Sequence, residues 1–204
     1  MDTTNSVLRV GLPKGRMQTK VVQLLADAGL PVSIEEREYR PRLGNGFSLK
    51  TQAGQLSYET KLLKPQNIVE MLSSGSRDVG FAGADWVREL KADLVELLDT
   101  GMDPVSVVVA APERLVKLIG EAGTPRTPWN KACGRNPIVA SEYESLAREW
   151  MAEKLPEGVF IRSYGATEVF PPEDADIIID NCATGSTLKA NGLVIMETVM
   201  KSST

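Results

Sequence analysis

The chain has 204 residues, 42% of them hydrophobic and 25% charged, with a formal net charge of -4, which is typical of a soluble globular protein. Because acidic residues outnumber basic ones, the composition excludes a broad basic surface for nucleic acid. No apolar stretch is long enough to span a bilayer, and the first residues lack the basic and apolar segments of a signal peptide. The two cysteines do not form a secreted pattern, so we expect a cytoplasmic protein with no nucleic-acid or membrane partner.

Histidine is absent from the sequence. Its absence excludes an imidazole base, a Ser–His or Cys–His pair and a histidine-ligated metal. Two cysteines alone also make a poor zinc site. Any chemistry must therefore use carboxylates, lysines, arginines, hydroxyls and backbone amides, and Mg2+ is the metal that such oxygen ligands suit.

The amino-terminal half alternates between strand and helix patterns. Its predicted elements are a strand over residues 7–12, a helix over 17–28, an irregular hairpin or mobile arm over 31–60, a helix over 65–74, a buried strand over 78–82 and a short helix from Trp86 capped by Asp85. The turn formed by Lys14, Gly15 and Arg16 follows the first strand directly. We therefore expect these basic residues at the carboxyl end of that strand.

The carboxyl-terminal half continues the alternation. Its predicted elements are a strand over 105–111, a helix and loop over 112–136, a strand over 137–140, a helix opened by a capping box at 141–144, a strand over 159–162, a turn into a short helix at 165–168, a strand over 177–179 and a last strand over 193–200. This order predicts an α/β protein with mostly parallel sheets.

Two chain crossings are predicted, one near residues 101–104 and one after residue 182. They divide the chain into lobe I, residues 1–102 plus 183–204, and lobe II, residues 103–182, which carries a phosphate loop at its end. A cleft between two lobes is a common place for a small ligand.

The most informative segment begins with three isoleucines, 177–179, which predict a buried parallel strand, and continues with Asp180 at the carboxyl end of that strand. A loop rich in small hydroxyl residues follows, and a helix is expected to open at Ser186 or Thr187. Backbone N–H groups would converge there as a phosphate cradle. A carboxylate beside such a cradle suits a ligand that also offers hydroxyls or Mg2+, as a phosphorylated ribose does. The alternative is a strand, a polar turn and a helix cap with no ligand.

Four segments, taken together, resemble the catalytic subunits of the ATP phosphoribosyltransferase family. They lie in the family's order and are Leu12–Arg16, Asp78–Gly83, Gly165–Glu168 and, above all, Asp180–Gly192. The resemblance implies a two-lobed fold similar to type II periplasmic binding proteins. It also implies condensation of ATP with phosphoribosyl pyrophosphate (PRPP), in the presence of Mg2+, to give N1-(5-phosphoribosyl)-ATP and pyrophosphate in the first step of histidine biosynthesis.

The length of the chain is similar to that of the family's short form, which has no regulatory domain of its own. The resemblance thus implies a homodimer within a hetero-oligomer that contains a regulatory subunit similar to histidyl-tRNA synthetase. The chain departs from the family at Ala183, where an acid or serine is usual, and at Lys64, where an arginine is usual. Two alternatives stay open: a non-catalytic ligand-binding protein of the same fold, and a catalytic subunit that is inactive without its partner.

The resemblance assigns roles to individual residues. The expected PRPP-binding residues are Asp180, Ala183, Thr184, Gly185, Ser186 and Thr187, and the expected ATP- and pyrophosphate-binding residues are Lys14, Gly15, Arg16 and Lys64. The expected catalytic residues are Asp180, Glu168 and Arg16. Asp180 would hold ribose hydroxyls directly or through Mg2+, and Glu168 would accept a proton from adenine or position a Mg2+-bound water.

Each of these assignments has a simpler alternative. Lys14 and Arg16 could be solvated turn charges, Asp180 could cap the next turn, and Glu168 could be an ordinary charge at a helix start. Tyr143 and Trp150 are predicted as core residues by their helical spacing.

Overall fold

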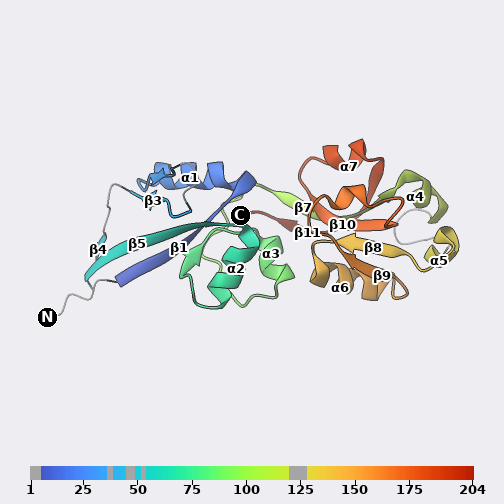
Figure 1. Cartoon of the computed structure of the whole chain (residues 1–204), viewed down its shortest axis with the longest axis horizontal. Helices are drawn as coiled ribbons and strands as arrows, with labels where there is room; N and C mark the ends of the chain where they lie inside the picture. Colours follow the sequence, from blue (N-terminus) through green and yellow to red (C-terminus); the bar gives the residue numbers. More distant parts are fainter. Residues whose placement is uncertain (1–5, 36–38, 45–48, 52–53, 120–127) are drawn as a thin grey trace. The chain divides into compact units, whose positions relative to one another are not determined.

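The computed structural model describes residues 6–35, 39–44, 49–51, 54–119 and 128–204 (Figure 1). The chain forms two compact units, Met1–Asp103 with Ser203–Thr204, and Pro104–Ser202. The predicted division differs from this one because it placed residues 183–204 in the first lobe. The reason is the last strand, which pairs along its length with a strand of the second unit.

The first unit is built on a four-stranded sheet with the strand order β4-β5-β1-β6. Strand β1 is parallel to both β5 and β6, and β4 is antiparallel to β5. A separate antiparallel pair, β2 with β3, lies in the segment predicted as a hairpin or arm, of which residues 36–38, 45–48 and 52–53 lie outside the described residues. The elements are β1 (Ser6–Pro13), the 3-10 helix η1 (Gly15–Met17), α1 (Gln18–Asp27), β2 (Val32–Ser33), β3 (Arg42–Leu43), β4 (Leu49–Thr51), β5 (Gly54–Leu63), α2 (Pro65–Ser73), β6 (Val79–Gly80) and α3 (Ala84–Glu89).

The two faces of this sheet carry different helices. Alternate residues of β1 point to opposite faces, so Val10 and Leu12 pack with Val21 of α1, whereas Gly11 faces Ile68 of α2. Figure 1 shows α1 on one face and α2 with α3 on the other. A Cβ atom on Gly80 would lie 2.5 Å from Ile68 Cγ2, and one on Gly11 would lie 3.1 Å from it. Both glycines therefore allow α2 to approach the sheet closely.

A charged pair fixes the beginning of β6 to β1. Arg9 Nη2 lies 2.6 Å from Asp78 Oδ1, and the Asp78 backbone N–H donates to the Arg9 carbonyl oxygen at 2.9 Å. Hydrogen bonds from the Arg9 side chain and backbone lower the pKa of Asp78 to about 2. Asp78, the first residue of one of the segments that carry the resemblance, is therefore a structural carboxylate.

The second unit is built on a five-stranded sheet with the order β11-β7-β10-β8-β9. Strands β10, β8 and β9 are parallel, and β7 is antiparallel to both β10 and β11. The α/β class is confirmed, with parallel pairing dominant in the first sheet and mixed pairing in the second. The elements are β7 (Val105–Pro112), α4 (Glu113–Ile119), α5 (Trp129–Cys133), β8 (Ile138–Ser141), α6 (Glu144–Lys154), β9 (Val159–Arg162), the 3-10 helix η2 (Thr167–Val169), β10 (Ile177–Cys182), α7 (Ser186–Ala190) and β11 (Leu193–Ser202).

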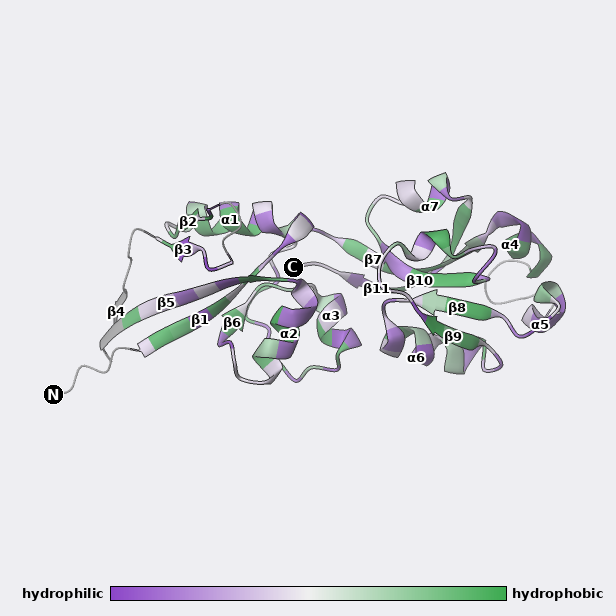
Figure 2. Ribbon diagram, viewed as in Figure 1, coloured by the Kyte–Doolittle hydropathy of each residue, from purple (hydrophilic) through white to green (hydrophobic). Residues whose placement is uncertain are grey.

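The core of the second unit lies on the central strands. Figure 2 shows the hydrophobic residues of β8 and β10 side by side, and Ala140 and Ile178 are fully buried there. Ile178 packs with Leu188 of α7, which anchors the short helix to the sheet. Strand β10 therefore ends in a fixed position, with the loop before α7 directly after it.

Two predicted helix starts are wrong. Helix α6 begins at Glu144 after Tyr143, because the Ser141 hydroxyl is used within the sheet, donating to the Ile179 carbonyl oxygen at 2.5 Å and accepting the Tyr143 N–H at 2.8 Å. Helix α3 begins at Ala84, so Asp85 lies buried in its first turn and does not cap it. Part of the predicted 112–136 loop, residues 120–127, lies outside the described residues. Among those described, no helix is long and apolar enough to cross a membrane.

Candidate functional site

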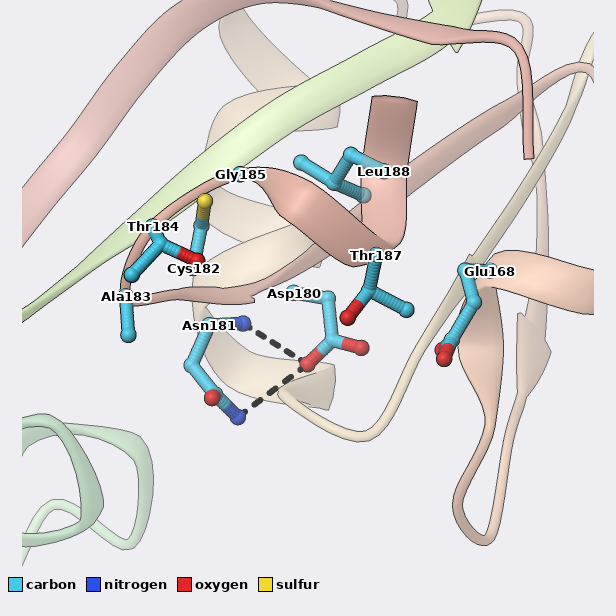
Figure 3. Close-up of a pocket in the computed structure, with 9 residues that line it drawn as sticks. All are labelled: Glu168, Asp180, Asn181, Cys182, Ala183, Thr184, Gly185, Thr187 and Leu188. Atoms are coloured by element: carbon cyan, nitrogen blue, oxygen red, sulfur yellow. Dashed lines mark hydrogen bonds between the residues drawn. The ribbon is translucent and has the colours of Figure 1, made fainter. Parts of the chain in front are cut away.

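A cavity of about 270 Å3 opens at the carboxyl end of β10 in the second unit (Figure 3). It lies where the strand gives way to the loop before α7, and η2 provides one further wall. Its lining residues are Glu168, Asp180, Asn181, Cys182, Ala183, Thr184, Gly185, Thr187 and Leu188. Most of these side chains are polar or small, so the cavity suits a polar ligand more than an apolar one.

Asp180 is brought into the cavity by the strand that precedes it. Ile177, Ile178 and Ile179 are fully buried, and β10 is flanked by β7 and β8 on its two sides. The strand leaves the core at Asp180, which is half-buried. The predicted position of this carboxylate at the carboxyl end of a buried strand is confirmed.

Hydrogen bonds hold one side of the Asp180 carboxylate. The Asn181 backbone N–H donates to Oδ1 at 2.7 Å, and the Asn181 Nδ2 donates to the same oxygen at 3.3 Å. Figure 3 shows the other carboxylate oxygen directed away from Asn181, toward the side of the cavity where Thr187 and Glu168 lie. The Thr167 side chain also hydrogen-bonds to this carboxylate. These hydrogen bonds restrict the orientation of the Asp180 carboxylate at the wall of the cavity.

The negative charge of Asp180 is not balanced locally. Burial, with smaller contributions from the nearby Glu142 and Glu168, raises the pKa of Asp180 to about 6 against the lowering effect of hydrogen bonds from Asn181 and Thr167. No ion pair in the described part of the chain includes Asp180. A partly buried carboxylate near other carboxylates is costly to keep charged, and such groups are often found at functional sites.

The loop before α7 is shaped by Gly185. Its φ is +77°, a left-handed conformation that disfavours L side chains, and it stands at the residue before α7. A Cβ atom there would meet only Cys182 Sγ, at 3.8 Å, so conformation, and not space within the chain, requires glycine. The Thr184 and Ser186 hydroxyls lie 2.9 Å apart. The predicted helix start at Ser186 is confirmed.

Glu168 enters the cavity from a strained turn. Gly165 and Ala166 both have positive φ, +108° and +47°, and η2 follows directly. Thr167 is fully buried, and its hydroxyl lies 2.8 Å from that of Ser163. The buried pair fixes η2, so Glu168 lines the same cavity as Asp180.

The predicted basic residues gather in the first unit. Strands β1 and β5 are parallel with Pro13 opposite Leu63, and the Lys14 N–H donates to the Leu63 carbonyl oxygen at 2.8 Å. Lys14, Gly15, Arg16 and Lys64 therefore lie at the same edge of one sheet. Lys14 Nζ lies 3.5 Å from the ring centroid of Tyr39, whose ring is exposed. The structure brings these four residues together in the first unit and the cavity residues together in the second.

The cavity can contribute oxygen ligands to a cation that also binds the substrate. Asp180 and Glu168 are two carboxylates in one cavity, but no group of three or more acidic or cysteine side chains able to hold a metal occurs in the described residues. Mg2+ commonly takes one or two protein carboxylates together with substrate phosphate oxygens and water. The donor set fits a Mg2+ site shared with a phosphorylated ligand and not one made by protein alone.

Sequence reasoning found part of this site. Glu168, Asp180 and most of the predicted loop residues line the cavity, whereas Ser186 does not and instead bonds to Thr184. It missed Asn181 as a partner of Asp180, and Thr167 as a second one. The position of Asn181 directly after Asp180 could have indicated this contact. The direction of its side chain, however, depends on Tyr143, which is distant in the sequence.

The chain is similar to known proteins over its whole length. The family model described as "HisG: ATP phosphoribosyltransferase" matches residues 64–204. The ATP phosphoribosyltransferases of Pelodictyon phaeoclathratiforme and Chlorobaculum parvum are each 34% identical, over 204 and 209 residues, and the matches cover 100% of this chain and 64% of each relative. The chain thus spans slightly less than two thirds of the length of these relatives.

A solved structure shares the fold. The structure titled "ATP phosphoribosyl transferase (HisG:HisZ) complex from Thermotoga maritima" superimposes with a TM-score of 0.73 and 22% identity. The match covers 96% of this chain and 84% of that chain. The likeness to type II periplasmic binding proteins stays a prediction.

Proposed function

Because this chain belongs to the ATP phosphoribosyltransferase family, we propose that it transfers the 5-phosphoribosyl group of PRPP to N1 of ATP. The products would be N1-(5-phosphoribosyl)-ATP and pyrophosphate, as in the first step of histidine biosynthesis. The observation that carries the proposal is the cavity in which Asp180 lies beside the loop of residues 183–187. That arrangement offers a carboxylate for ribose hydroxyls and a polar loop for a phosphate in one place.

The 5-phosphate of PRPP would bind to the loop. Thr184, Gly185, Ser186 and Thr187 would donate backbone N–H and hydroxyl hydrogen bonds, and Ala183 would contribute backbone alone. The left-handed Gly185 turns the backbone where this contact is made. Asp180 would accept hydrogen bonds from the ribose hydroxyls with the oxygen that Asn181 leaves open.

The reaction needs alignment and charge stabilisation more than a strong base. Pyrophosphate leaves the ribose carbon as positive charge develops there, and adenine N1 attacks through its lone pair. Arg16, Lys14 and Lys64 would stabilise phosphate charges of ATP or pyrophosphate, and Gly15 would allow the turn that presents them. Glu168 would accept the proton that adenine releases, so a chain without histidine can perform the whole step.

Magnesium fits this proposal as a cofactor shared with the substrate. Asp180 would hold it, with Glu168 as a second carboxylate in the same cavity. Bound Mg2+ would supply neutralisation of charge on the pyrophosphate group. The carboxylate pair keeps this part of the cavity acidic, which favours a cation beside the ribose.

We also propose a cytoplasmic assembly. The solved complex from Thermotoga maritima is named for two components, HisG and HisZ. By analogy, this chain would form a homodimer and combine with a separate regulatory subunit similar to histidyl-tRNA synthetase. Size-exclusion chromatography with light scattering, on the chain alone and after mixing with such a subunit, tests this directly.

The first test is pyrophosphate release from ATP and PRPP with Mg2+. We expect release that requires both substrates, and Asp180→Asn and Arg16→Ala should each depress it strongly. Release only after addition of the regulatory subunit would favour the partner-dependent form. PRPP binding without release under either condition would overturn the transferase proposal and support a binding protein.

A further inference from the structure

Asn181 is exposed, yet its side-chain nitrogen contacts two other side chains of the protein. Its Nδ2 lies 3.3 Å from Asp180 Oδ1 and 3.2 Å from the Tyr143 hydroxyl oxygen. We propose that Asn181 is a positioning residue that fixes the orientation of the Asp180 carboxylate, and that Tyr143 acts through it. This inference rests on the proposed function of Asp180 as a ligand of the ribose.

The chemistry of the three groups allows one orientation of the amide. A carboxylate accepts hydrogen bonds and cannot donate them, so the NH2 group of Asn181, and not its carbonyl oxygen, must face Asp180. The second hydrogen of that NH2 group then points to the Tyr143 hydroxyl, which accepts it. Two contacts through one nitrogen therefore define the rotation of the amide, which an exposed asparagine would otherwise leave free.

Tyr143 is a rigid support for this amide. It is fully buried, and its backbone N–H donates to Ser141 Oγ at 2.8 Å. Ser141 Oγ in turn donates to the carbonyl oxygen of Ile179, the residue before Asp180. The contacts form a closed circuit from β10 through Asn181, Tyr143 and Ser141 back to β10. Such a circuit ties the exposed end of the strand to the buried Tyr143.

The circuit decides which carboxylate oxygen faces the ligand. Oδ1 receives both the backbone N–H and the Nδ2 of Asn181, while the other oxygen is directed toward the cavity (Figure 3). The terminal torsion of an aspartate is broad and has no strong preference of its own. Without the Asn181 side chain, only the backbone bond would still hold Oδ1, and with Thr167 as the one remaining side-chain partner the carboxylate would sample orientations that do not suit the ribose.

The test uses the full chain, with its regulatory subunit if turnover requires one. The variants are Asn181→Leu, Asn181→Asp, Tyr143→Phe and the double variant Asn181→Leu/Tyr143→Phe. Equilibrium binding of PRPP and steady-state kinetics are measured for each. Asn130→Leu and Tyr164→Phe are matched controls, because both residues are exposed, lie in the second unit and do not line the cavity.

Removal of a charge-assisted hydrogen bond should lower kcat/KM for PRPP by roughly 10–100-fold in Asn181→Leu. Asn181→Asp is nearly isosteric but replaces a donor with a second negative charge, so its loss should be larger still. Tyr143→Phe should lose about 2–10-fold. The KM for ATP should stay within about twofold in all four, since the circuit contacts only the Asp180 side of the reaction.

Non-additivity separates positioning from simple structure. If Tyr143 acts through Asn181, the double variant should equal Asn181→Leu and not the product of the two single losses. Thermal unfolding identifies any Tyr143→Phe that fails to fold, in which case Asn181→Leu and Asn181→Asp decide the matter alone. Wild-type PRPP binding in both Asn181 variants would overturn the inference, and so would a multiplicative double variant. A wild-type protein that neither binds nor uses PRPP would instead overturn the proposed function, and the inference with it.

Discussion

Asp78 and Asp180 belong to segments that resemble the same family, yet the two units treat them in opposite ways. In the first unit, Arg9 contacts Asp78 at 2.6 Å, and hydrogen bonds from Arg9 lower its pKa to about 2. In the second unit, burial raises the pKa of Asp180 to about 6, and the nearest charges are carboxylates. The surroundings of Asp78 stabilise its charged form, whereas the surroundings of Asp180 oppose its charged form.

This contrast gives a physical way to separate structure from function within a motif. A charge that its neighbours stabilise has a sufficient structural explanation. A charge that its neighbours oppose, at the wall of a cavity, needs a ligand to explain it. By this criterion Asp180, and not Asp78, is the carboxylate on which activity should depend.

The largest expected effect is on turnover. Asp180→Asn should lower kcat by ~10²–10³-fold, as loss of a key electrostatic contact typically does. Asp78→Asn should leave kcat within about threefold and reduce thermal stability instead, because it loses its ion pair with Arg9. Pyrophosphate release and thermal unfolding, measured on both variants, test the comparison. Equal losses of kcat in the two would contradict it.

The next effect concerns the loop glycine. Gly185→Ala forces a side chain into φ +77° and should cost about 1 kcal/mol of unfolding free energy, together with an approximately tenfold loss of PRPP affinity. Gly134→Ala is the matched control, since Gly134 has φ +69°, open space and a place away from the cavity. It should lose similar stability and no affinity. Equal affinity in both variants would mean that the loop does not bind the phosphate.

The pH dependence of the free energy of unfolding should distinguish Asp78 from Asp180 independently of any enzymatic activity. The folded pKa of Asp180 is about 6 against an ordinary 3.8, so its contribution favours the folded state at low pH and is lost as pH rises through about 6. The folded pKa of Asp78 is about 2, so its contribution is present above about 4 and is lost as pH falls toward 2. Denaturant unfolding of the wild type and of each Asn variant, from pH 3 to about pH 8, measures both slopes. If both carboxylates changed the free energy of unfolding in the same direction as pH rises, the contrast between a raised pKa at Asp180 and a lowered pKa at Asp78 would be wrong.

The smallest expected effect is in the first unit, at the ring beneath Lys14. Tyr39→Leu removes the ring that lies 3.5 Å from Lys14 Nζ and should raise the KM for ATP by about 2–5-fold, in line with the energy of an exposed cation–π contact. Tyr39→Phe keeps the ring and should behave as the wild type. A KM that both variants leave unchanged would favour the interpretation of Lys14 as a solvated turn charge.

Local patterns predicted the elements that carry the site. The isoleucines before Asp180 and the hydroxyl residues after it describe β10 and the start of α7 correctly, because a buried strand and a helix start depend mainly on nearby residues. The matched segments likewise led to the family, which the comparisons confirm.

What the sequence could not reveal depends on distant partners. The predicted capping box at residues 141–144 is wrong because the Ser141 hydroxyl donates to the carbonyl oxygen of Ile179 on a neighbouring strand. The residues around Ser141 in the sequence do not indicate this partner. Residues 193–202 were assigned to the wrong lobe because antiparallel pairing with β7 leaves no mark in strand periodicity. The sequence also did not reveal Asn181 as a partner of Asp180, because the direction of its side chain depends on the hydroxyl of Tyr143, which is distant in the sequence.

The glycines that let α2 lie against the first sheet bear on how relatives of this chain can be recognised. Gly80 belongs to the Asp78–Gly83 segment, and any side chain there would collide with Ile68. Packing and the ion pair with Arg9 are therefore enough to require Gly80 and Asp78, whether or not the cavity of the second unit still binds a substrate. A gene copy that had lost catalysis would still need these two residues in order to fold, so they indicate a shared fold, and the residues around Asp180 must be inspected before an activity is assigned.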